Sequence, residues 1–497
     1  MSLHRISRRV FIQGAASALA LSSLPGRPAF AQTTVRIRPE WQEFRSTTEY
    51  ASLIDAIRTM RANTNAGSRS SLQYWANAHV NYGQHAIPYF LGWHRAYLYY
   101  FEQQLRIVSG NNNLVLPYWD YYRNPQIPAE FTDPARDNPL YLPRTNTNVF
   151  SALTLSPFNP SIWNFQRGTS NAFEPLLEDA PHNPVHNIIG GIMGTMQAPH
   201  DLLFFLHHAN VDRLWHAWAL PDGKGIPWTS SPYWSGSFRV SADLTLPRSQ
   251  CYHPNWVGTD YADNTTPTAL PAQALKKGRI MRVQAQLGRQ RGRPPVGDFA
   301  ATGPRAIAAG RRSIGGARDI GLTENSVSVQ VPVAQDADSR RLQTLAVRPR
   351  ERPQGATPAD GYKSVVVVLD NIRMLPAGKA GGFYYKVYLN LPERGDAAAT
   401  AEGHLLGTIG SFEIEAASHH AHHGGAAQIT FPATDVLANL PADGFRELTV
   451  SLVRVSGNNS PKGRAIAIGE MRVEVSTEEA YDLTPHVAPP ANSPYRR

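Results

Sequence analysis

The stretch HNPVHNIIGGIMGTMQAPHDLLFFLHHANVD, residues 182–212, places five histidines on a largely apolar background. His182 and His186 are four residues apart, so on a helix their side chains lie one above the other on the same face. The doublet His207 and His208 follows a run of leucine and phenylalanine. Because a buried imidazole is costly unless it is hydrogen-bonded or bound to a metal, this pattern predicts helices that hold a metal site.

A second group of histidines lies upstream, in NAHVNYGQHAIPYFLGWHR, residues 77–95, which contains His79, His85 and His94. Neither group includes a thiol, and carboxylates at ligand spacing are few. Three neutral imidazoles leave a metal coordinatively open, and they favour copper or zinc over magnesium, calcium or an iron–sulfur cluster. These stretches lack the glutamate of an HExxH zinc protease and the Glu-x-x-His pairs of a di-iron bundle.

The N-terminal half of the chain is predicted to be mainly helical. Apolar residues recur at helical spacing in TEYASLIDAIRTMRANT, residues 48–64, with Ser46 or Thr47 as the expected N-cap. A second helix is expected from about Trp93 to Val108. Residues 121–172 are rich in Pro, Asn and Thr and predict a long ordered loop, after which helices return in the opening stretch.

The C-terminal part of the chain differs in composition and in the spacing of its apolar residues. Lys276–Arg318 is rich in Arg, Gly, Ala and Pro and predicts a linker. Beyond it the apolar period changes to two, as in FYYKVYLNL, Phe383–Leu391, and SVVVVLDNI predicts a more fully buried strand. Several short strands separated by turn residues predict a β-sandwich.

The fold class expected from these patterns is α+β and multidomain, with a mainly α-helical, four-helix metal domain followed by an all-β sandwich. The expected segments are a leader at 1–31, the helical domain at 32–275, a basic linker at 276–319, the β-sandwich at 320–478 and a tail at 479–497.

The first 31 residues predict a removable export signal. Paired arginines in SRRVFIQG, Ser7–Gly14, precede the apolar run GAASALALSSL and the small-residue sequence AFA before Gln32. This order is typical of a twin-arginine signal, and eleven weakly apolar residues cannot cross about 30 Å of hydrocarbon. We expect cleavage after Ala31, a periplasmic or secreted product and no membrane anchor after cleavage.

Composition limits the possible partners. The formal net charge is +9, and removing the four arginines of the leader leaves +5. No nucleic-acid motif accompanies this charge, so we expect no nucleic-acid partner. The single cysteine, Cys251, excludes an internal disulfide, and stability must come from packing or bound metal.

Three segments resemble tyrosinases and polyphenol oxidases over about residues 40–260. HAIPYFLGWHRAYLYYFE resembles their first copper-binding region, PHNPVHNIIGG with FFLHHANVDRLW resembles the second, and LPYWDY is typical of the same family. The β region around SVVVVLDNI and FYYKVYLNLPE resembles, more weakly, the C-terminal domain of plant-type polyphenol oxidases.

This resemblance implies two copper ions in a type-3 binuclear centre, O2 as co-substrate and small phenols as substrates. His79, His85 and His94 would hold one copper, and His182, His186 and His207 the other. His208 would pack beside the last ligand, although the sequence leaves the order of His207 and His208 open. The reactions implied are ortho-hydroxylation of monophenols and oxidation of o-diphenols to o-quinones.

The resemblance also implies roles for three further residues. Hydroxylation requires a deprotonated phenol, whose pKa is near 10, so a base is needed. Glu178, with Glu174 as second choice, and Asn183 would hold the water that acts as this base, while helix capping is the alternative role for Asn183. Asp212 would accept a hydrogen bond from a ligand imidazole and fix its tautomer.

Several alternatives remain open at this level. A catechol oxidase without hydroxylase activity, a hemocyanin-like O2 carrier and a zinc hydrolase could each use similar ligands. The β domain could be an inhibitory shield over the copper site or a rigid module away from it. His419, His420, His422 and His423 could capture copper or form an exposed polar loop. The sequence does not specify the natural phenol or the oligomeric state.

Overall fold

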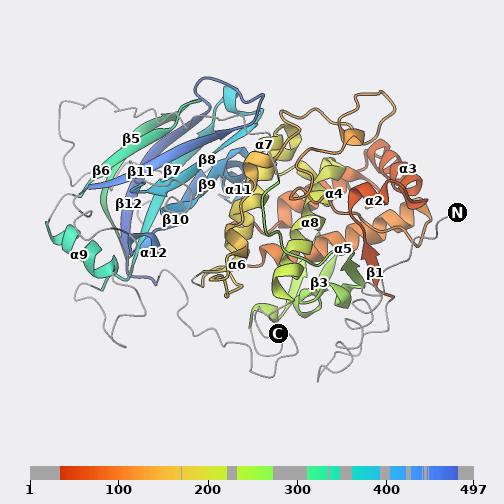
Figure 1. The fold of residues 1–497 in the computed structure, drawn as a ribbon, viewed down its shortest axis with the longest axis horizontal. Helices are drawn as coiled ribbons and strands as arrows, with labels where there is room; N and C mark the ends of the chain where they lie inside the picture. The colour runs from red at the N-terminus through yellow and green to blue at the C-terminus, as the bar shows by residue number, and fades with distance from the viewer. Residues whose placement is uncertain are drawn as a thin grey trace.

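A computed structural model describes residues 34–169, 171–220, 232–271, 310–333, 336–346, 361–391, 403–420, 427–438, 440, 445 and 447–479. The expected leader, most of the expected linker and most of the tail lie outside these residues. Figure 1 shows a helical domain beside a β-sandwich, with α11 and α7 where the two meet. Within the described part of the chain, no helix combines the length and apolarity needed to span a bilayer.

The first domain is helical, as predicted. Its main helices are α2 (Trp41–Phe44), α3 (Glu49–Ala62), α4 (Leu72–Tyr82), α5 (Phe90–Ser109), α6 (Phe173–Leu177), the π-helical turn η5 (Glu178–His182), α7 (Asn183–Ile189) and α8 (Leu202–Ala219). Two small sheets flank them, one parallel and one antiparallel; their strands are β1 (Arg36–Arg38) with β4 (Thr259–Tyr261), and β2 (Ser237–Arg239) with β3 (Thr245–Pro247). Residues 121–172 form the expected ordered loop, with a few 3-10 turns.

Helix starts differ from the expected ones by a few residues. The N-cap of α3 is Thr48 rather than Ser46 or Thr47, and its side chain makes no capping hydrogen bond. Helix α5 starts at Phe90, three residues earlier than expected. At α8 the carboxylate of Asp201 accepts the N–H of Leu203, which satisfies a backbone donor that a helix start otherwise leaves unpaired.

Helices α5 and α8 are joined by charge as well as by packing. Arg95 Nε lies 2.7 Å from Asp212 Oδ1, and both side chains are almost fully buried. The Arg95 guanidinium also stacks over Trp215, 3.6 Å from the ring centroid. Because α5 carries His94 and α8 carries the histidine doublet, this ion pair sets the register between the helices of the two histidine groups.

The second domain is a sandwich of two four-stranded antiparallel sheets, as predicted. One sheet has the order β10 (Ala427–Pro432), β7 (Ser364–Met374), β12 (Ile466–Ser476) and β5 (Arg311–Leu322). The other has the order β6 (Val327–Pro332), β11 (Glu447–Ser456), β8 (Phe383–Leu389) and β9 (Leu405–Gly410). Three helices that the sequence did not predict accompany the sheets: α9 (Asp336–Ala346), α11 (Ser411–His420) and α12 (Thr434–Leu437).

The expected end of the linker at residue 319 is wrong. Arg311–Leu322 is an edge strand that pairs with β12, and Ile320 and Leu322 are buried in the sandwich. Its arginines are engaged: Arg312, for example, lies 3.2 Å from Asp338. The arginine-rich composition did not indicate a strand, because its pairing partner β12 lies about 150 residues further along the chain. Residues 272–309 of the expected linker lie outside the described residues.

The sandwich is docked on the helical domain through buried contacts. On β8, Tyr384 faces away from the sandwich core and packs into the helical core, where its hydroxyl donates to the carbonyl of Ser151 at 2.8 Å. Asn146 donates to the carbonyl of Ile188 at 2.9 Å and accepts the N–H of Asn459 at 2.8 Å. The hydrogen bonds of Tyr384 with Ser151 and of Asn459 with Asn146 thus join the two domains across more than 200 residues of chain.

We expect Arg95→Met to lower the free energy of unfolding by about 3 kcal/mol or more, because it leaves the Asp212 carboxylate buried without its closest cation. Urea unfolding of the copper-free protein measures this value. Arg58→Met, which removes an exposed ion pair with Asp55, is the matched control and should change stability by less than about 1 kcal/mol. Equal effects of the two substitutions would contradict the assigned role of Arg95.

Candidate metal centre

The first histidine cluster contains the three residues expected from the sequence. His79 comes from α4, His94 from α5, and His85 from the loop between these helices. Their ring nitrogens all lie within 4.8 Å of one another, and all three side chains are buried. Two helical histidines and one loop histidine thus lie together in the interior of the helical domain.

Hydrogen bonds orient the two helical rings. His79 Nδ1 lies 2.8 Å from the carbonyl of Met196, and His94 Nδ1 lies 2.8 Å from the carbonyl of Phe90. A carbonyl only accepts, so each Nδ1 carries the proton and each Nε2 presents a lone pair. Within the described structure neither Nε2 has a hydrogen-bond partner. Buried acceptors left in this way are satisfied when a metal ion binds between them.

The second cluster contains His182, His186, His207 and His208, again with ring nitrogens within 4.8 Å of one another. His182 Nδ1 lies 2.8 Å from the side-chain oxygen of Asn183, and His186 Nδ1 lies 2.6 Å from the carbonyl of Met193. The Nε2 atoms of His182 and His186 lie 3.1 and 3.5 Å from His208 Nε2. Two imidazoles about 2.0 Å from one tetrahedral metal have nitrogens about 3.3 Å apart, so these three rings fit a shared ion.

These distances favour His208 over His207 as the third ligand, the reverse of the preferred sequence assignment. The His207 ring stacks on His182 at 5.2 Å and lies 5.6 Å from Tyr121. Successive side chains on a helix point about 100° apart, so adjacent histidines present different faces to one centre. His207 therefore lies beside the cluster, in the position expected for His208.

The two clusters face each other. The rings of His94 and His208 stack with centroids 4.4 Å apart, and those of His85 and His182 lie 6.2 Å apart. Burial lowers the pKa of His79 to about 4 and that of His186 to about 3. Burial likewise holds the pKa of His182 well below its usual range. The imidazoles are therefore neutral at physiological pH, which is the form that binds a metal ion.

The role expected for Asp212 is wrong. Its carboxylate accepts hydrogen bonds from Arg95 Nε and from the hydroxyl of Tyr261, and it lies 3.8 Å from Arg38. No imidazole is among its partners in the described structure. A buried carboxylate is better satisfied by guanidinium groups than by a neutral imidazole. The side chain that fixes a ligand tautomer is instead Asn183, through its contact with His182.

Glu178 and Glu174 both lie buried near the start of the second cluster. Glu178 accepts the N–H of Ala86 at 2.7 Å and a guanidinium N–H of Arg167 at 2.7 Å. Burial raises the pKa of Glu178 to about 7, and Arg167 opposes that rise. Glu174 accepts the hydroxyl of Tyr233 at 2.7 Å, and burial also raises its pKa. Neither carboxylate contacts Asn183 directly in the described structure.

Phe412, from α11 of the β domain, covers the histidines. Its ring stacks on His186 with centroids 4.2 Å apart and lies 5.3 Å from His85 and 5.5 Å from His182. It is 1% exposed. The sequence did not indicate this residue, because nothing within SFEIEAASHH shows that α11 packs against histidines more than 200 residues away in the chain. Ser418 and His419 are exposed at the end of the same helix rather than in a loop.

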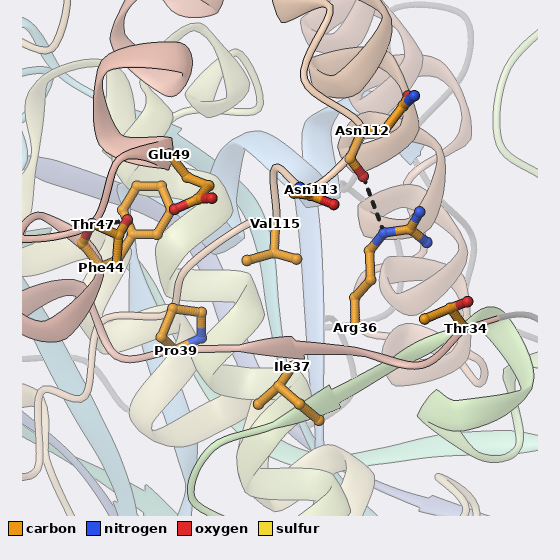
Figure 2. A pocket seen from close by; sticks show the side chains of 10 residues that line it. All are labelled: Thr34, Arg36, Ile37, Pro39, Phe44, Thr47, Glu49, Asn112, Asn113 and Val115. Atoms are coloured by element: carbon orange, nitrogen blue, oxygen red, sulfur yellow. Dashed lines mark hydrogen bonds between the residues drawn. The ribbon is translucent and has the colours of Figure 1, made fainter.

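Figure 2 shows a separate pocket of about 380 Å³ next to β1. Its floor is apolar, and Arg36 Nε at its rim donates to the carbonyl of Asn112 at 3.3 Å. Its lining contains no histidine, and Arg36 and Glu49 are its charged residues. This pocket therefore lacks the ligands that the histidine clusters supply.

Comparisons with known proteins agree with the geometry. The common central domain of tyrosinase matches residues 57–152 and 132–220, and a domain of unknown function (DUF7868) matches residues 314–476. The chain is 31% identical over 194 residues to a tyrosinase of Streptomyces glaucescens, an alignment that covers 30% of this chain and 69% of that protein.

Two further similarities were found. A tyrosinase of Hahella sp. is 33% identical over 208 residues, covering 32% of this chain and 45% of that protein. The chain thus spans less than half the length of that relative. The solved structure of latent apple tyrosinase covers 90% of this chain and 99% of its own chain, at 20% identity and a TM-score of 0.49.

The residues present fit the metal pair of this family: buried neutral imidazoles from two facing clusters, with Nδ1 anchored on carbonyl oxygens at three positions and on the Asn183 amide oxygen at His182. The chain belongs to the tyrosinase family, and its two histidine clusters form the site of a type-3 pair of copper ions.

Proposed function

We propose that this chain is an exported oxidase that uses O2 to hydroxylate monophenols at the ortho position and to oxidise o-diphenols to o-quinones. The observation that carries the proposal is the pair of facing histidine clusters, whose Nδ1 anchors leave the Nε2 lone pairs directed inward. His79, His85 and His94 would hold one copper ion, and His182, His186 and His208 the other. When bound, the copper pair supplies the reactivity toward O2.

The protein groups around the site would supply the rest of the chemistry. Phe90 packs against His94 and His182 at 4.8 and 4.7 Å, so the centre is walled by apolar rings that exclude water. A dry surrounding strengthens each electrostatic contact made inside it. Glu178, with a pKa of about 7, would be half ionised near neutral pH and could take up the phenol proton through a water held with Asn183.

This arrangement favours an enzyme over an O2 carrier, because a carrier has no use for a base poised near neutral pH. A catechol oxidase without hydroxylase activity remains the second candidate, since it would need the copper ligands but not the base. Oxygen uptake on tyramine and on dopamine separates the two. Uptake on both supports the proposal, and uptake on dopamine alone supports the catechol oxidase. A zinc hydrolase or an O2 carrier would give no sustained uptake on either.

We further propose that the β domain keeps the enzyme latent, with Phe412 as the blocking ring. Its stacking on His186 supports this proposal, because a phenol that approached the second copper site from that side would meet the ring. The side-chain amide of Asn187 accepts the N–H of Phe412 at 2.9 Å and donates to Glu413 at 2.6 Å, so one residue of α7 holds the start of α11. The paired arginines and apolar run of residues 1–31 support export of the folded chain by the twin-arginine route.

His208→Ala should reduce bound copper from two ions to about one per chain and abolish oxidase activity, because it removes one of three imidazoles from an open site. His207→Ala is the matched control and should retain two copper ions. Atomic absorption after copper reconstitution measures both. The opposite pattern, with copper lost only in His207→Ala, would restore the preferred sequence assignment of the third ligand.

Asn183→Ala should lower tyramine turnover at least about tenfold more than dopamine turnover, both expressed per bound copper. Catechols are more acidic and bind through two oxygens, so they depend less on a held water. Asn183→Asp keeps an acceptor for His182 Nδ1 and controls for loss of that anchor. An equal fall in both turnovers would mean that Asn183 acts only on the tautomer of His182.

Phe412→Ala should raise the initial rate on a bulky o-diphenol several-fold without protease or detergent, because the ring on His186 is removed. Phe431→Ala, in the sandwich core, is the control and should affect stability but not the rate. Limited trypsin digestion within residues 272–309, which include Arg289, Arg291, Arg293 and Arg305, should give a similar rise, as should mild SDS. An unchanged rate in all three treatments would show that the β domain is not a shield.

A further inference from the structure

The loop that carries His85 is held in an unusual backbone conformation. His85 is the one histidine of the two described clusters that lies outside a helix or helical turn. The next residue, Ala86, has φ of +56°, and Tyr89 has φ of +82°. Left-handed backbone at a residue other than glycine costs about 1–3 kcal/mol and persists only when neighbouring contacts impose it. The position of His85 therefore depends on whatever holds this loop.

Glu178 makes that contact from the opposite side of the site. Its Oε1 accepts the N–H of Ala86 at 2.7 Å, and its side chain is 1% exposed. Glu178 belongs to η5, which ends at His182, so it links the loop of the first cluster to the segment that starts the second. A carboxylate in this setting holds the loop firmly only if it is ionised and correctly oriented.

Arg167 meets these two requirements. Its Nη2 donates to Glu178 Oε2 at 2.7 Å, the oxygen that Ala86 does not use. Its backbone N–H donates to Glu174 at 3.0 Å, and Glu174 in turn accepts the N–H of Leu91 at the start of α5, at 3.4 Å. One residue therefore anchors both carboxylates that contact the ligand-bearing loop and the helix after it.

The charges around Glu178 come from several elements. Asp179 follows it on η5, and its pKa is raised to about 6 by burial. Glu413 of α11 faces Asp179 across the domain contact, and like charge raises the pKa of Glu413 beyond the effect of burial. Arg167 is the cation that opposes the rise in pKa at both Glu178 and Asp179. Without it, this corner of the site would hold buried carboxylates and no nearby described cation.

We propose that Arg167 is a positioning residue for the copper site: its guanidinium orients Glu178, which holds the His85 loop through Ala86 and which would act as the base. The part concerning the base rests on the proposed function. The part concerning the loop stands on the hydrogen bonds alone.

The test compares Arg167→Met, Arg167→Lys and Arg45→Met in the full chain. Arg45 forms an ion pair of the same length, 2.7 Å, with Glu130 away from the histidines, and is the matched control. Three properties are measured for each variant. Titration of the copper-free protein gives the affinity of the first site for copper, and heating gives the unfolding temperature. Turnover of tyramine and of dopamine is recorded as a function of pH. Arg167→Met should weaken copper binding about tenfold or more. It should also move the pH midpoint of tyramine turnover upward by about one unit or more, because removal of a cation raises a carboxyl pKa.

Arg167→Lys should keep most of the wild-type copper affinity and most of the wild-type pH midpoint, since it retains the positive charge. If Arg167→Met does not fold, the double variant Arg167→Met with Glu178→Gln removes the charge together with its partner. That variant should fold but bind copper at the first site about tenfold more weakly than the wild-type chain, because nothing then orients the side chain that holds Ala86. Wild-type affinity in the double variant would overturn the loop role. Unchanged copper affinity in Arg167→Met would overturn the loop role. An equal fall on both substrates with no pH shift would overturn the role in acid–base chemistry. If the wild-type chain turns over neither phenol, the proposed function fails while the copper titration still tests Arg167.

Discussion

The structure depends on keeping buried imidazoles neutral in one apolar centre. Burial lowers the pKa of His79, His94, His182 and His186, so at physiological pH each of these four rings places its Nδ1 proton on an acceptor and directs its Nε2 lone pair inward. The protein supplies the acceptors from its backbone, at Met196, Phe90 and Met193, and from the amide of Asn183. A neutral oxygen fixes the tautomer of a ligand ring without adding a charge to the apolar centre. The anchors are accordingly neutral oxygens rather than acids.

This constraint explains where the charges of the helical domain lie. Asp212 is one helical turn beyond His208, yet its carboxylate accepts hydrogen bonds from Arg95 and Tyr261 rather than from a histidine. Asp212 therefore joins α8 to α5, the helix that carries His94. Glu178 and Glu174 are also buried, and each accepts hydrogen bonds from donors of the protein. The described charges around the centre therefore position backbone and helices: Asp212 joins α5 to α8, and Glu178 holds Ala86 beside His85.

Local patterns in the sequence predicted the histidine clusters, the helices that carry them and the alternating strands, because each depends on spacing within one element. Contacts between distant elements could not be predicted in this way. Asp212 was assigned to an imidazole because its arginine partners come from α5 and β1. The order of His207 and His208 depends on a rotation of about 100°, finer than a helix boundary can be predicted from sequence. Phe412 reaches His186 across more than 200 residues, with no periodic signal around it.

The β domain takes part in the same apolar centre. Neutral imidazoles without an ion pair are kept from water by apolar neighbours, and one of these neighbours comes from outside the helical domain. Phe412 of α11 stacks on His186 with ring centroids 4.2 Å apart and is almost fully buried there. Asn187, the residue after His186, holds that ring by its backbone. The β domain thus reaches the second histidine cluster through α7, the helix that carries His186, so a shift of α11 would change the packing of Phe412 on His186 and the hydrogen bond to Asn187 together.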